Sequence, residues 1–230
     1  MSVSVVIPAY NYGRYVVDAV ESAFAQTHAP LEVIVVDDGS TDDTRERLRP
    51  YASRIRLVHQ ENRGAAAALN RGIQLAQGEW IAWLSADDAF LPTKLEDQLA
   101  HAQRHPEDRL IYTDWCSVDA QGRVTQMYRL PSLPRRELVS FLFRYCAING
   151  STTLIRRECF QTHGLFAEDL RQAHDWDMWL RLVRDYPFGH VPKVLLRYRW
   201  HGANLSAQAD ALAYNPEVLR RARVWYGIGH

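Results

Sequence analysis

Two adjacent carboxylates that follow an apolar run are the first residues in the chain with an evident chemistry. The run Trp80–Leu84 stops at Ser85, and Asp87 and Asp88 come shortly after it. Short apolar runs with polar flanks are typical of buried strands, and open α/β sheets bind ligands beyond the carboxyl ends of their strands. Carboxylates at such a place suit Mg²⁺ or Mn²⁺, which take oxygen ligands and commonly bind substrate phosphates as well. The alternative is that one Asp caps the following helix and the other faces water.

A second carboxylate pair ends the β-branched run Glu32–Val36, which also predicts a strand. Asp37 and Asp38 come directly after this run, and Ser40 and Asp42 follow them. Ser and Asp are favoured N-caps of helices. Each aspartate of the pair is therefore a candidate for a ligand site or for a cap, although Ser40 and Asp42 fit the capping role as well.

A regular alternation of strands and helices positions these carboxylates. β-Branched and apolar runs predict the strands, and apolar residues at helical spacing predict the helices. The strands are expected at Val3–Ile7, Glu32–Val36, Ile55–His59, Trp80–Leu84 and Leu110–Thr113, and helices at Tyr15–Gln26, Gly64–Ala76 and Pro92–Arg104. This alternation is typical of a parallel sheet with right-handed crossovers.

The second half of the chain has a mixed order of elements. We expect a hairpin at Ser117–Tyr128, helices at Arg135–Tyr145 and Asp175–Tyr186, and strands at Thr152–Ile155 and Val191–Tyr198. The predicted fold class is therefore α/β, with a mostly parallel sheet that is flanked by helices and extended by antiparallel strands in the C-terminal half. Because no stretch has the composition of a linker, we expect a single domain over residues 1–230.

Composition excludes several classes of protein. The 230 residues are 47% hydrophobic, and 27 acidic residues balance 27 basic ones, so no charge excess indicates nucleic acid binding. The N-terminus lacks a signal segment, and no run approaches the roughly 20 apolar residues that span a bilayer. Cys116, Cys146 and Cys159 lack metal-ligand spacing and fit reduced thiols. We therefore expect a cytoplasmic protein, at most peripheral to a membrane.

Other nucleotide-binding motifs are missing from the sequence. No G-x-G-x-x-G follows Val3–Ile7, which argues against a dinucleotide-dependent dehydrogenase. No G-x-x-x-x-G-K-[ST] occurs, which excludes a P-loop. Nucleotidyltransferases carry a glycine-rich loop with Arg and Lys after the first strand, whereas this chain has Pro8-Ala9-Tyr10-Asn11 there.

Five stretches of the sequence resemble the family 2 glycosyltransferases of the GT-A fold. In order they are VSVVIPAYNYGRYVVDAVESAFAQT, VIVVDDGSTDDT, an N-x-G followed by LNRGI, GEWIAWLSADD and HDWDMWLRL, and the likeness extends to about Ser206. The resemblance implies a GT-A (Rossmann-like) fold and an inverting enzyme, which moves a sugar from a nucleotide-diphosphate donor, usually a UDP-sugar, to an acceptor hydroxyl. We assign a nucleotide-sugar-binding half to residues 1–114, an acceptor-binding half to 115–206 and a C-terminal extension to 207–230.

The resemblance assigns a nucleotide site to the edge where the first strands end. The residues expected to form a wall for the nucleobase are Pro8, Ala9 and Tyr10. An acidic residue at the position of Asp38 hydrogen-bonds the base in the family, usually uracil, through its ring N–H, and Asp37 is a second expected partner. Arg63 follows the third predicted strand, where it reaches a phosphate or is solvated.

The resemblance also implies a divalent metal, Mg²⁺ or Mn²⁺. The family motif is D-x-D or x-D-D, and Ser85 stands here in place of the first carboxylate, so Asp87 and Asp88 must serve. The implied roles are contact with the ribose for Asp87 and metal binding for Asp88, with Asp87 a further ligand. His201 follows the last strand, where it is either a metal or diphosphate partner or a structural histidine.

Asp175 is the catalytic base that the resemblance implies. Inversion requires a carboxylate on the face opposite the leaving phosphate, where it takes the proton of the acceptor hydroxyl. Many relatives have Glu-Asp at this point, and this chain has His174-Asp175. The alternatives are that Asp175 is only a helix N-cap, that Asp177 is the base, and that His174 is a solvated loop residue.

The resemblance places the chain in bacterial-type polysaccharide or glycoconjugate synthesis, with a saccharide or lipid-linked saccharide as acceptor. The alternative is a catalytically degenerate module that binds a nucleotide-sugar, an idea that Ser85 supports. The segment Pro216–Tyr226 predicts a basic amphipathic helix, which either rests on an anionic membrane or docks on the main domain.

Overall fold

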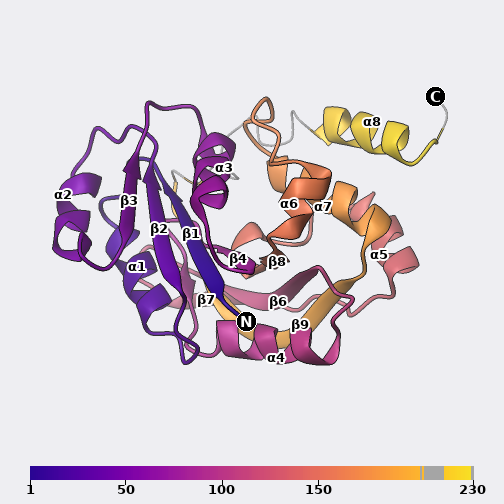
Figure 1. Cartoon of the computed structure of the whole chain (residues 1–230), viewed down its shortest axis with the longest axis horizontal. Helices are drawn as coiled ribbons and strands as arrows, with labels where there is room; N and C mark the ends of the chain where they lie inside the picture. Colours follow the sequence, from indigo (N-terminus) through magenta and orange to yellow (C-terminus); the bar gives the residue numbers. More distant parts are fainter. Residues whose placement is uncertain (203, 205–214, 229–230) are drawn as a thin grey trace.

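The computed structural model describes residues 1–202, 204 and 215–228. Its strands form one mixed sheet in the order β3-β2-β1-β4-β8-β6-β9-β5, with β7 paired to β6. The first four of these strands run parallel, and they are β3 (Arg56–His59), β2 (Glu32–Asp37), β1 (Val3–Ala9) and β4 (Trp80–Trp83) (Figure 1). β1 is buried over its whole length, as expected of a parallel strand that is covered on both faces.

The second half of the chain extends this sheet with strands of both directions. β8 (Leu154–Arg156) runs antiparallel to β4 and to β6 (Leu110–Val118). β6 also pairs with β7 (Val124–Tyr128), antiparallel, and with β9 (Phe188–Arg199), parallel. β9 in turn pairs antiparallel with β5 (Ala89–Phe90). The predicted α/β fold class, with antiparallel strands in the C-terminal half, is confirmed.

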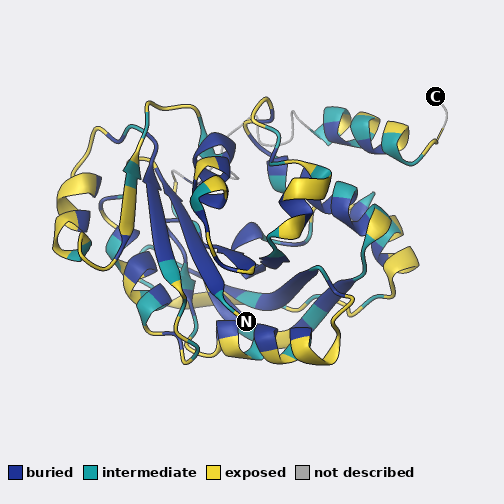
Figure 2. Cartoon of the chain, in the orientation of Figure 1, coloured by how far each residue is buried: buried dark blue, intermediate teal, exposed yellow. Residues whose placement is uncertain are grey.

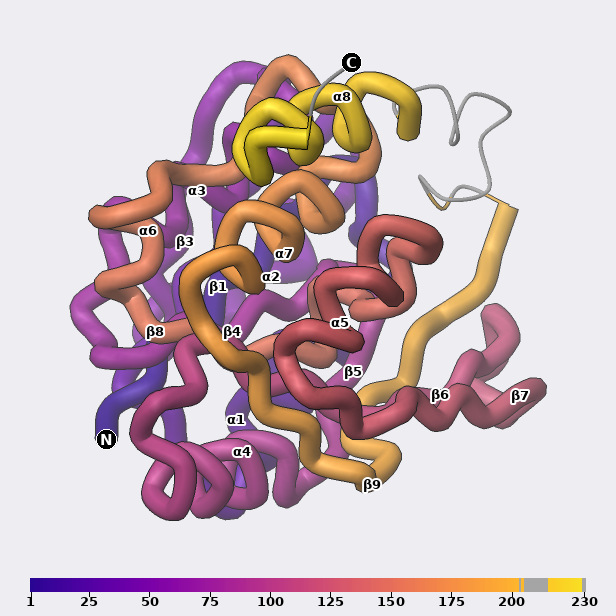
Figure 3. The backbone as a smooth tube through the Cα atoms, turned by 90° about the vertical axis from the view of Figure 1, so that its right-hand side faces the viewer, coloured from indigo at the N-terminus to yellow at the C-terminus, as the bar shows by residue number. Residues whose placement is uncertain are grey.

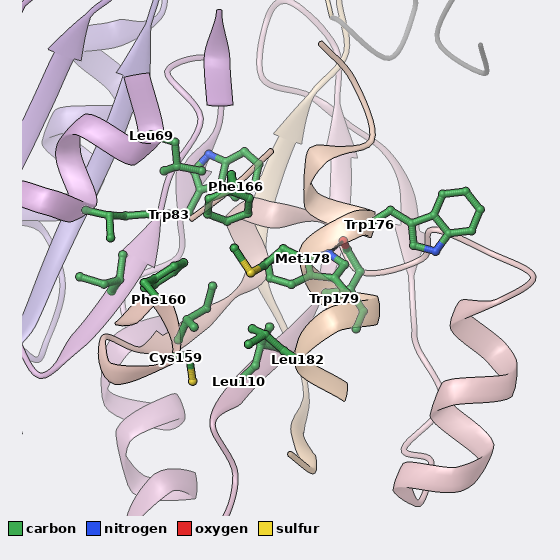
Figure 4. Packing of buried hydrophobic residues seen from close by; sticks show 14 of the residues in the cluster. Leu69, Trp83, Leu110, Cys159, Phe160, Phe166, Trp176, Met178, Trp179 and Leu182 are labelled. Atoms are coloured by element: carbon green, nitrogen blue, oxygen red, sulfur yellow. Dashed lines mark hydrogen bonds between the residues drawn. The ribbon is translucent and has the colours of Figure 1, made fainter. Parts of the chain in front are cut away.

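Helices cover both faces of the sheet (Figures 1 and 2). They are α1 (Val16–Phe24), α2 (Thr44–Leu48), α3 (Ala65–Leu75), α4 (Lys94–Arg104), α5 (Arg135–Leu142), α6 (Glu158–His163), α7 (His174–Asp185) and α8 (Asn215–Trp225), with 3-10 turns η1 (Arg49–Tyr51) and η2 (Gly150–Thr152). Alternate residues of β1 enter two hydrophobic clusters, because side chains on a strand point to opposite faces. Val5 and Ile7 belong to the cluster with α1 and α4, whereas Val6 belongs to the cluster with α3, α6 and α7, part of which Figure 4 shows.

β6 is longer than the sequence predicted, since the strand expected at Leu110–Thr113 continues to Val118. The predicted strand ended before Asp114 because this residue is polar, yet Asp114 is only 2% exposed. Its Oδ1 accepts hydrogen bonds from the Leu130 backbone N–H at 2.9 Å and from His190 Nε2 at 2.9 Å. A buried carboxylate is tolerated in a strand when it has such partners.

The C-terminal helix α8 lies against α7, as Figures 1 and 3 both show. Val218 and Ala222 are fully buried in the cluster that includes α7, and the Tyr226 hydroxyl donates to the Leu180 carbonyl at 3.1 Å. A helix was predicted here, and its apolar side docks on the main domain. The expected boundary between Ser206 and residue 207 lies outside the described residues. Among the described helices, none is long and apolar enough to cross a bilayer.

Candidate active site

A cavity of about 910 Å³ opens at the edge where the parallel strands end. Its walls come from the loops after β1, β2, β3 and β4 and from three parts of the second half: residues 149–150, the segment 168–175, and Tyr198 with Asn204. The sequence-predicted residues that line it are Pro8, Ala9, Tyr10, Asp38, Arg63, Asp87 and Asp175. Three other predicted residues, Asp37, Asp88 and His201, do not line this cavity. The fold therefore brings residues from both halves of the chain to one cavity.

Asp38 is a buried carboxylate in the cavity wall, at 2% exposure. Its Oδ1 accepts from Gln60 Nε2 at 2.7 Å and from the Arg63 backbone N–H at 3.0 Å, and its Oδ2 accepts from the Gly64 backbone N–H at 2.8 Å. A carboxylate has about four acceptor sites. The three donors fix the loop before α3 and leave one acceptor site for a ligand N–H.

Asp37 is turned away from the cavity and holds the loop after β2. Its carboxylate accepts from the Ser40 backbone N–H at 3.0 Å, from Arg45 Nε and from His59 Nδ1 at 2.9 Å. Burial raises the pKa of Asp37, but the hydrogen bonds from Ser40, Arg45 and His59 outweigh it and hold the pKa below its usual value. The structure gives Asp37 a loop-stabilising role, which is close to the capping alternative.

The two carboxylates after β4 have different surroundings. Asp87 faces the cavity, and its Oδ2 lies 3.1 Å from His201 Nε2 and 3.2 Å from Asn204 Nδ2. Asp88 is 1% exposed, and its Oδ1 accepts from the Arg199 backbone N–H at 3.1 Å. Its Oδ2 is buried and has no hydrogen-bond partner in the described part of the chain. Burial and the charge of Asp87 raise the pKa of Asp88 well above its usual range.

Residues at the end of β9 and at the N-terminal end of α1 surround this carboxylate pair. Arg199 Nε donates to the Asp87 carbonyl at 3.0 Å, and its Nη2 donates to Asp18 Oδ2 at 2.9 Å. The Tyr15 ring lies 4.8 Å from the Arg199 guanidinium carbon and stacks on His201 at 5.0 Å between centroids. The sequence did not reveal Arg199 or Tyr15, because these contacts join residues that are 112 or more positions apart.

Tyr12 is another cavity residue that the sequence did not reveal. Burial and the neighbouring carboxylates Asp87 and Asp88 raise the pKa of Tyr12 above its ordinary value. Its hydroxyl therefore stays protonated beside the carboxylate pair and is able to donate a hydrogen bond there.

Asp175 lines the cavity as the second residue of α7. The N-cap of this helix is Ala173, which has a left-handed φ of 59° and makes no side-chain cap bond. Asp175 Oδ1 instead accepts from the Trp176 backbone N–H at 2.8 Å. The alternative that Asp175 is the N-cap is therefore wrong. A carboxylate in the first turn is still favoured by the helix dipole.

The two neighbours of Asp175 that were weighed as alternatives are both buried. Asp177 is 1% exposed and pairs with Arg181 Nη2 at 2.9 Å, outside the cavity wall. Burial raises the pKa of Asp177, and Arg181 opposes the rise. His174 is 5% exposed and lines the cavity, so the interpretation as a solvated loop residue is wrong.

The cations of the cavity rim differ in their partners. Arg63 Nη2 donates to Glu168 Oε2 at 2.8 Å, and Asn70 Nδ2 donates to Glu168 Oε1 at 3.0 Å. Arg63 therefore ties the loop before α3 to the segment before α7 rather than standing alone in solvent. Arg171 also lines the cavity and forms no ion pair in the described ranges.

Comparisons with known proteins bear on the family and the fold of the chain. The sequence model of glycosyl transferase family 2 matches residues 4–164. An uncharacterized glycosyltransferase of Rickettsia prowazekii is 34% identical over 214 residues, which cover 90% of this chain and 66% of the relative. The chondroitin synthase of Escherichia coli is 35% identical over 208 residues, which cover 89% of this chain and 30% of the relative.

A solved structure, that of Staphylococcus aureus TarS residues 1–349 in complex with UDP-GlcNAc, has the same fold. It superposes with a TM-score of 0.79 at 22% identity and covers 97% of this chain and 66% of that chain. This chain thus spans 66% or less of the relatives and the solved structure described here. The family match covers most of the chain and the structural likeness gives the fold, so the chain belongs to glycosyl transferase family 2 and has the GT-A fold.

Proposed function

We propose that the chain is an inverting glycosyltransferase that moves a sugar from a UDP-sugar to an acceptor hydroxyl. The observation that carries this proposal is the meeting of Asp38, Asp87 and Asp175 in one cavity. The TarS structures in complex with UDP-GlcNAc and with UDP support a uridine nucleotide as the donor's leaving group. In more detail, we propose that the transferred sugar is a hexose and that the reaction depends on a metal ion. The product would belong to the synthesis of a polysaccharide or glycoconjugate.

The nucleotide is expected along the ends of β1 and β2. Pro8, Ala9 and Tyr10 would flank the base, and the remaining acceptor site of Asp38 would take the uracil ring N–H. Arg63 is paired with Glu168. To bind a phosphate of the donor, its guanidinium would have to contact Glu168 and the phosphate together or leave Glu168 for the phosphate.

Asp38→Asn should weaken UDP binding about tenfold, because a ligand N–H would lose a charged acceptor. Asp37→Asn is the matched control, since it changes a neighbouring carboxylate that lies outside the cavity. It should lower the melting temperature and leave UDP affinity unchanged. Calorimetric titration with UDP and thermal melts measure both effects. Equal losses of affinity in the two variants would contradict the assignment.

The residues near Asp87 fit a divalent cation. Asp88 Oδ2 is buried without a partner, and Asp87 faces the cavity beside His201. Among the described residues, no set of three or more His, Cys, Asp or Glu side chains is arranged to hold an ion, so phosphate oxygens of the donor would complete its coordination. When bound, Mg²⁺ or Mn²⁺ offsets the charge that develops on the leaving diphosphate. We assign Asp87 as the principal ligand, with Asp88 behind it, which reverses the roles implied by the sequence resemblance.

In the transfer step, the acceptor oxygen attacks the anomeric carbon from the face opposite the UDP group. The new C–O bond forms as the bond from the anomeric carbon to the phosphate oxygen breaks, and UDP leaves with that electron pair. Asp175 takes the proton of the acceptor hydroxyl. The acceptor, a saccharide or lipid-linked saccharide in this proposal, enters from the second-half side of the cavity.

A catalytically degenerate nucleotide-sugar-binding module is the second candidate. Ser85, which replaces a family carboxylate, hydrogen-bonds through its backbone N–H and side chain to Ser151 Oγ, at 3.0 and 3.1 Å. Hydrolysis of a UDP-sugar with no acceptor present separates the two candidates. Slow release of UDP that disappears in Asp175→Asn supports the enzyme, whereas binding without any release supports the module.

Contact with a membrane is tested on α8. Its residues Val218 and Ala222 are buried, and Arg220 and Arg221 pair with Glu217, which leaves Arg223 for an anionic surface. Flotation with anionic liposomes should therefore be the same for the unaltered chain and for Arg223→Glu. A loss of flotation in Arg223→Glu would support a peripheral site at the inner face of the membrane.

The cytoplasmic location stays a prediction, with which the three free cysteines agree.

A further inference from the structure

Another cavity lies along the exposed side of α5, outside the proposed active site. Its volume is about 420 Å³, and ligand pockets typically measure roughly 300–1,000 Å³. We call this cavity the α5 groove. Six of the residues that line it belong to α5 and to the turn after it, and they are Arg136, Glu137, Ser140, Phe141, Arg144 and Tyr145.

These six side chains form two parallel rows, because residues four positions apart lie on the same side of a helix. Arg136, Ser140 and Arg144 form one row, and Glu137, Phe141 and Tyr145 form the other. The helical turn continues beyond the end of α5, since the Tyr145 N–H donates to the Phe141 carbonyl at 3.0 Å. One row is therefore mostly cationic and the other mostly aromatic.

The cationic row is suited to a ligand with negative charges. Arg136 and Arg144 are exposed, and neither guanidinium forms an ion pair within residues 1–202, 204 and 215–228. The two residues lie roughly 12 Å apart along the helix axis, at a rise of about 1.5 Å per residue. Glu137 offsets one of the two charges, so the groove keeps a net positive charge. Guanidinium groups bind carboxylate and phosphate oxygens through parallel N–H groups.

The aromatic row is suited to a sugar ring. Tyr145 is 60% exposed, and its ring centre lies 5.5 Å from that of Phe141, at an angle of 50°. The face of an aromatic ring carries partial negative charge, and the C–H groups of a pyranose, which carry partial positive charge, pack against it. A saccharide with anionic substituents therefore matches both rows, whereas a free phosphate ion would contact only one.

The α5 groove ends beside the proposed catalytic base. Cys146 follows Tyr145, and its Sγ lies 3.9 Å from Asp175 Oδ2. α5 is fixed on α7, because Trp176 Nε1 donates to the Leu142 carbonyl at 2.6 Å. Figures 1 and 3 show the two helices side by side. A chain that lies in the groove therefore leads to the carboxylate that takes the proton of the acceptor hydroxyl.

We propose that the α5 groove binds the acceptor and that the acceptor is a saccharide chain with negative charges, an inference that rests on the proposed function. The sugar that receives the transferred residue lies at Asp175. The sugars behind it lie along α5, with their anionic groups at Arg144 and Arg136. An anionic membrane matches the groove less well, because Glu137 lies beside the arginines and repels a uniformly negative surface.

An array of oligosaccharides tests the preference for charge. The unaltered protein, in saturating UDP and Mn²⁺, should bind members with uronate, phosphate or sulfate groups more tightly than their neutral counterparts. The comparison of uronate with phosphate members shows which anion the arginines recognise. Higher ionic strength should weaken this binding, since salt screens exposed charge pairs.

The double variant Arg136→Gln/Arg144→Gln should raise the Kd of the best anionic oligosaccharide about tenfold, because two exposed charge pairs are lost. The Kd of its neutral counterpart and the Kd of UDP should stay unchanged. Tyr145→Ala should instead weaken the binding of the anionic and the neutral oligosaccharide alike, because stacking does not depend on the charge of the substituent. Calorimetric titration measures all of these constants.

Arg49→Gln/Arg56→Gln is the matched control. Both arginines are exposed and form no ion pair in the described part of the chain, and they belong to η1 and β3, away from α5 (Figure 1). This variant loses the same charge as the groove variant, so a non-specific electrostatic effect would appear in it as well. Its Kd for the anionic oligosaccharide should equal that of the unaltered protein.

Several results would overturn the inference. They are equal binding of neutral and anionic oligosaccharides, equal losses of affinity in the two double variants, and binding of UDP without binding of any oligosaccharide. Binding to phosphatidylglycerol liposomes that is lost in Arg136→Gln/Arg144→Gln, with no such loss for oligosaccharides, would make the groove a membrane contact. A failure of the unaltered protein to bind UDP would instead refute the proposed function, so the two failures are distinguishable.

Discussion

Asp175→Asn should lower the rate of sugar transfer by 10²–10⁴-fold, the range typical of a lost general base, or about 3–5 kcal/mol of barrier. The amide keeps the size of the side chain and the acceptor for the Trp176 N–H, but it cannot take a proton at neutral pH. Losing a charge in the first turn of α7 costs about 0.3–1 kcal/mol of stability. The loss of rate is therefore expected without a comparable loss of fold. Single-turnover transfer with saturating donor measures it.

Asp177→Asn is the control for this prediction. Asp177 is two residues away on the same helix, but its carboxylate is buried against Arg181 and outside the cavity wall. It should lower the melting temperature, since a buried ion pair loses one charge, and leave the rate per folded molecule near that of the unaltered protein. A near-normal rate in Asp175→Asn would exclude it as the base. A parallel loss of UDP affinity would place Asp175 in the donor site instead.

The order of the elements and the edge that carries the site were predictable from the sequence. Strands in parallel sheets are uniform apolar runs, and polar residues begin where each run ends, so Asp38 and Asp87 were identifiable as edge residues from local pattern alone. The resemblance added Asp175, which comes from the other half of the chain. All three line one cavity.

Which side chain of each carboxylate pair faces the cavity was not predictable. The choice depends on partners that are distant in sequence: His59 and Arg45 hold Asp37, and the backbone of Arg199 holds Asp88. Local spacing carries no information on such contacts.

The burial of two polar residues was also not predictable from the sequence, because it depends on contacts between residues that are distant in sequence. Asp114 lies within β6 because His190 pairs with it, and His174 is buried because Trp83 and Phe166 pack around it. A polar residue in a sequence normally indicates a loop or a surface. Each of these residues departs from that pattern through a tertiary contact.

Asp87→Asn should abolish the stimulation of UDP binding and transfer by Mn²⁺, and excess chelator should do the same to the unaltered protein. Asp87 is the carboxylate that faces the cavity, and without a cation it would repel the donor's diphosphate. Removing the charge therefore removes the ligand that brings the cation to the phosphates. Calorimetric titration of UDP with and without Mn²⁺, together with transfer rates, measures the effect.

Asp88→Asn is the matched variant for this last prediction. The amide oxygen keeps the acceptor for the Arg199 backbone N–H, and the side chain stands behind the cavity wall, so the Mn²⁺ effect should be reduced less than in Asp87→Asn. The reverse order of the two variants would restore the roles implied by the sequence resemblance, with Asp88 as the principal ligand. Full transfer in excess chelator would remove the metal from the proposal. The charge on the leaving diphosphate would then be stabilised by hydrogen-bond donors of this chain. Tyr12 and Arg171 are such donors, and both line the same cavity.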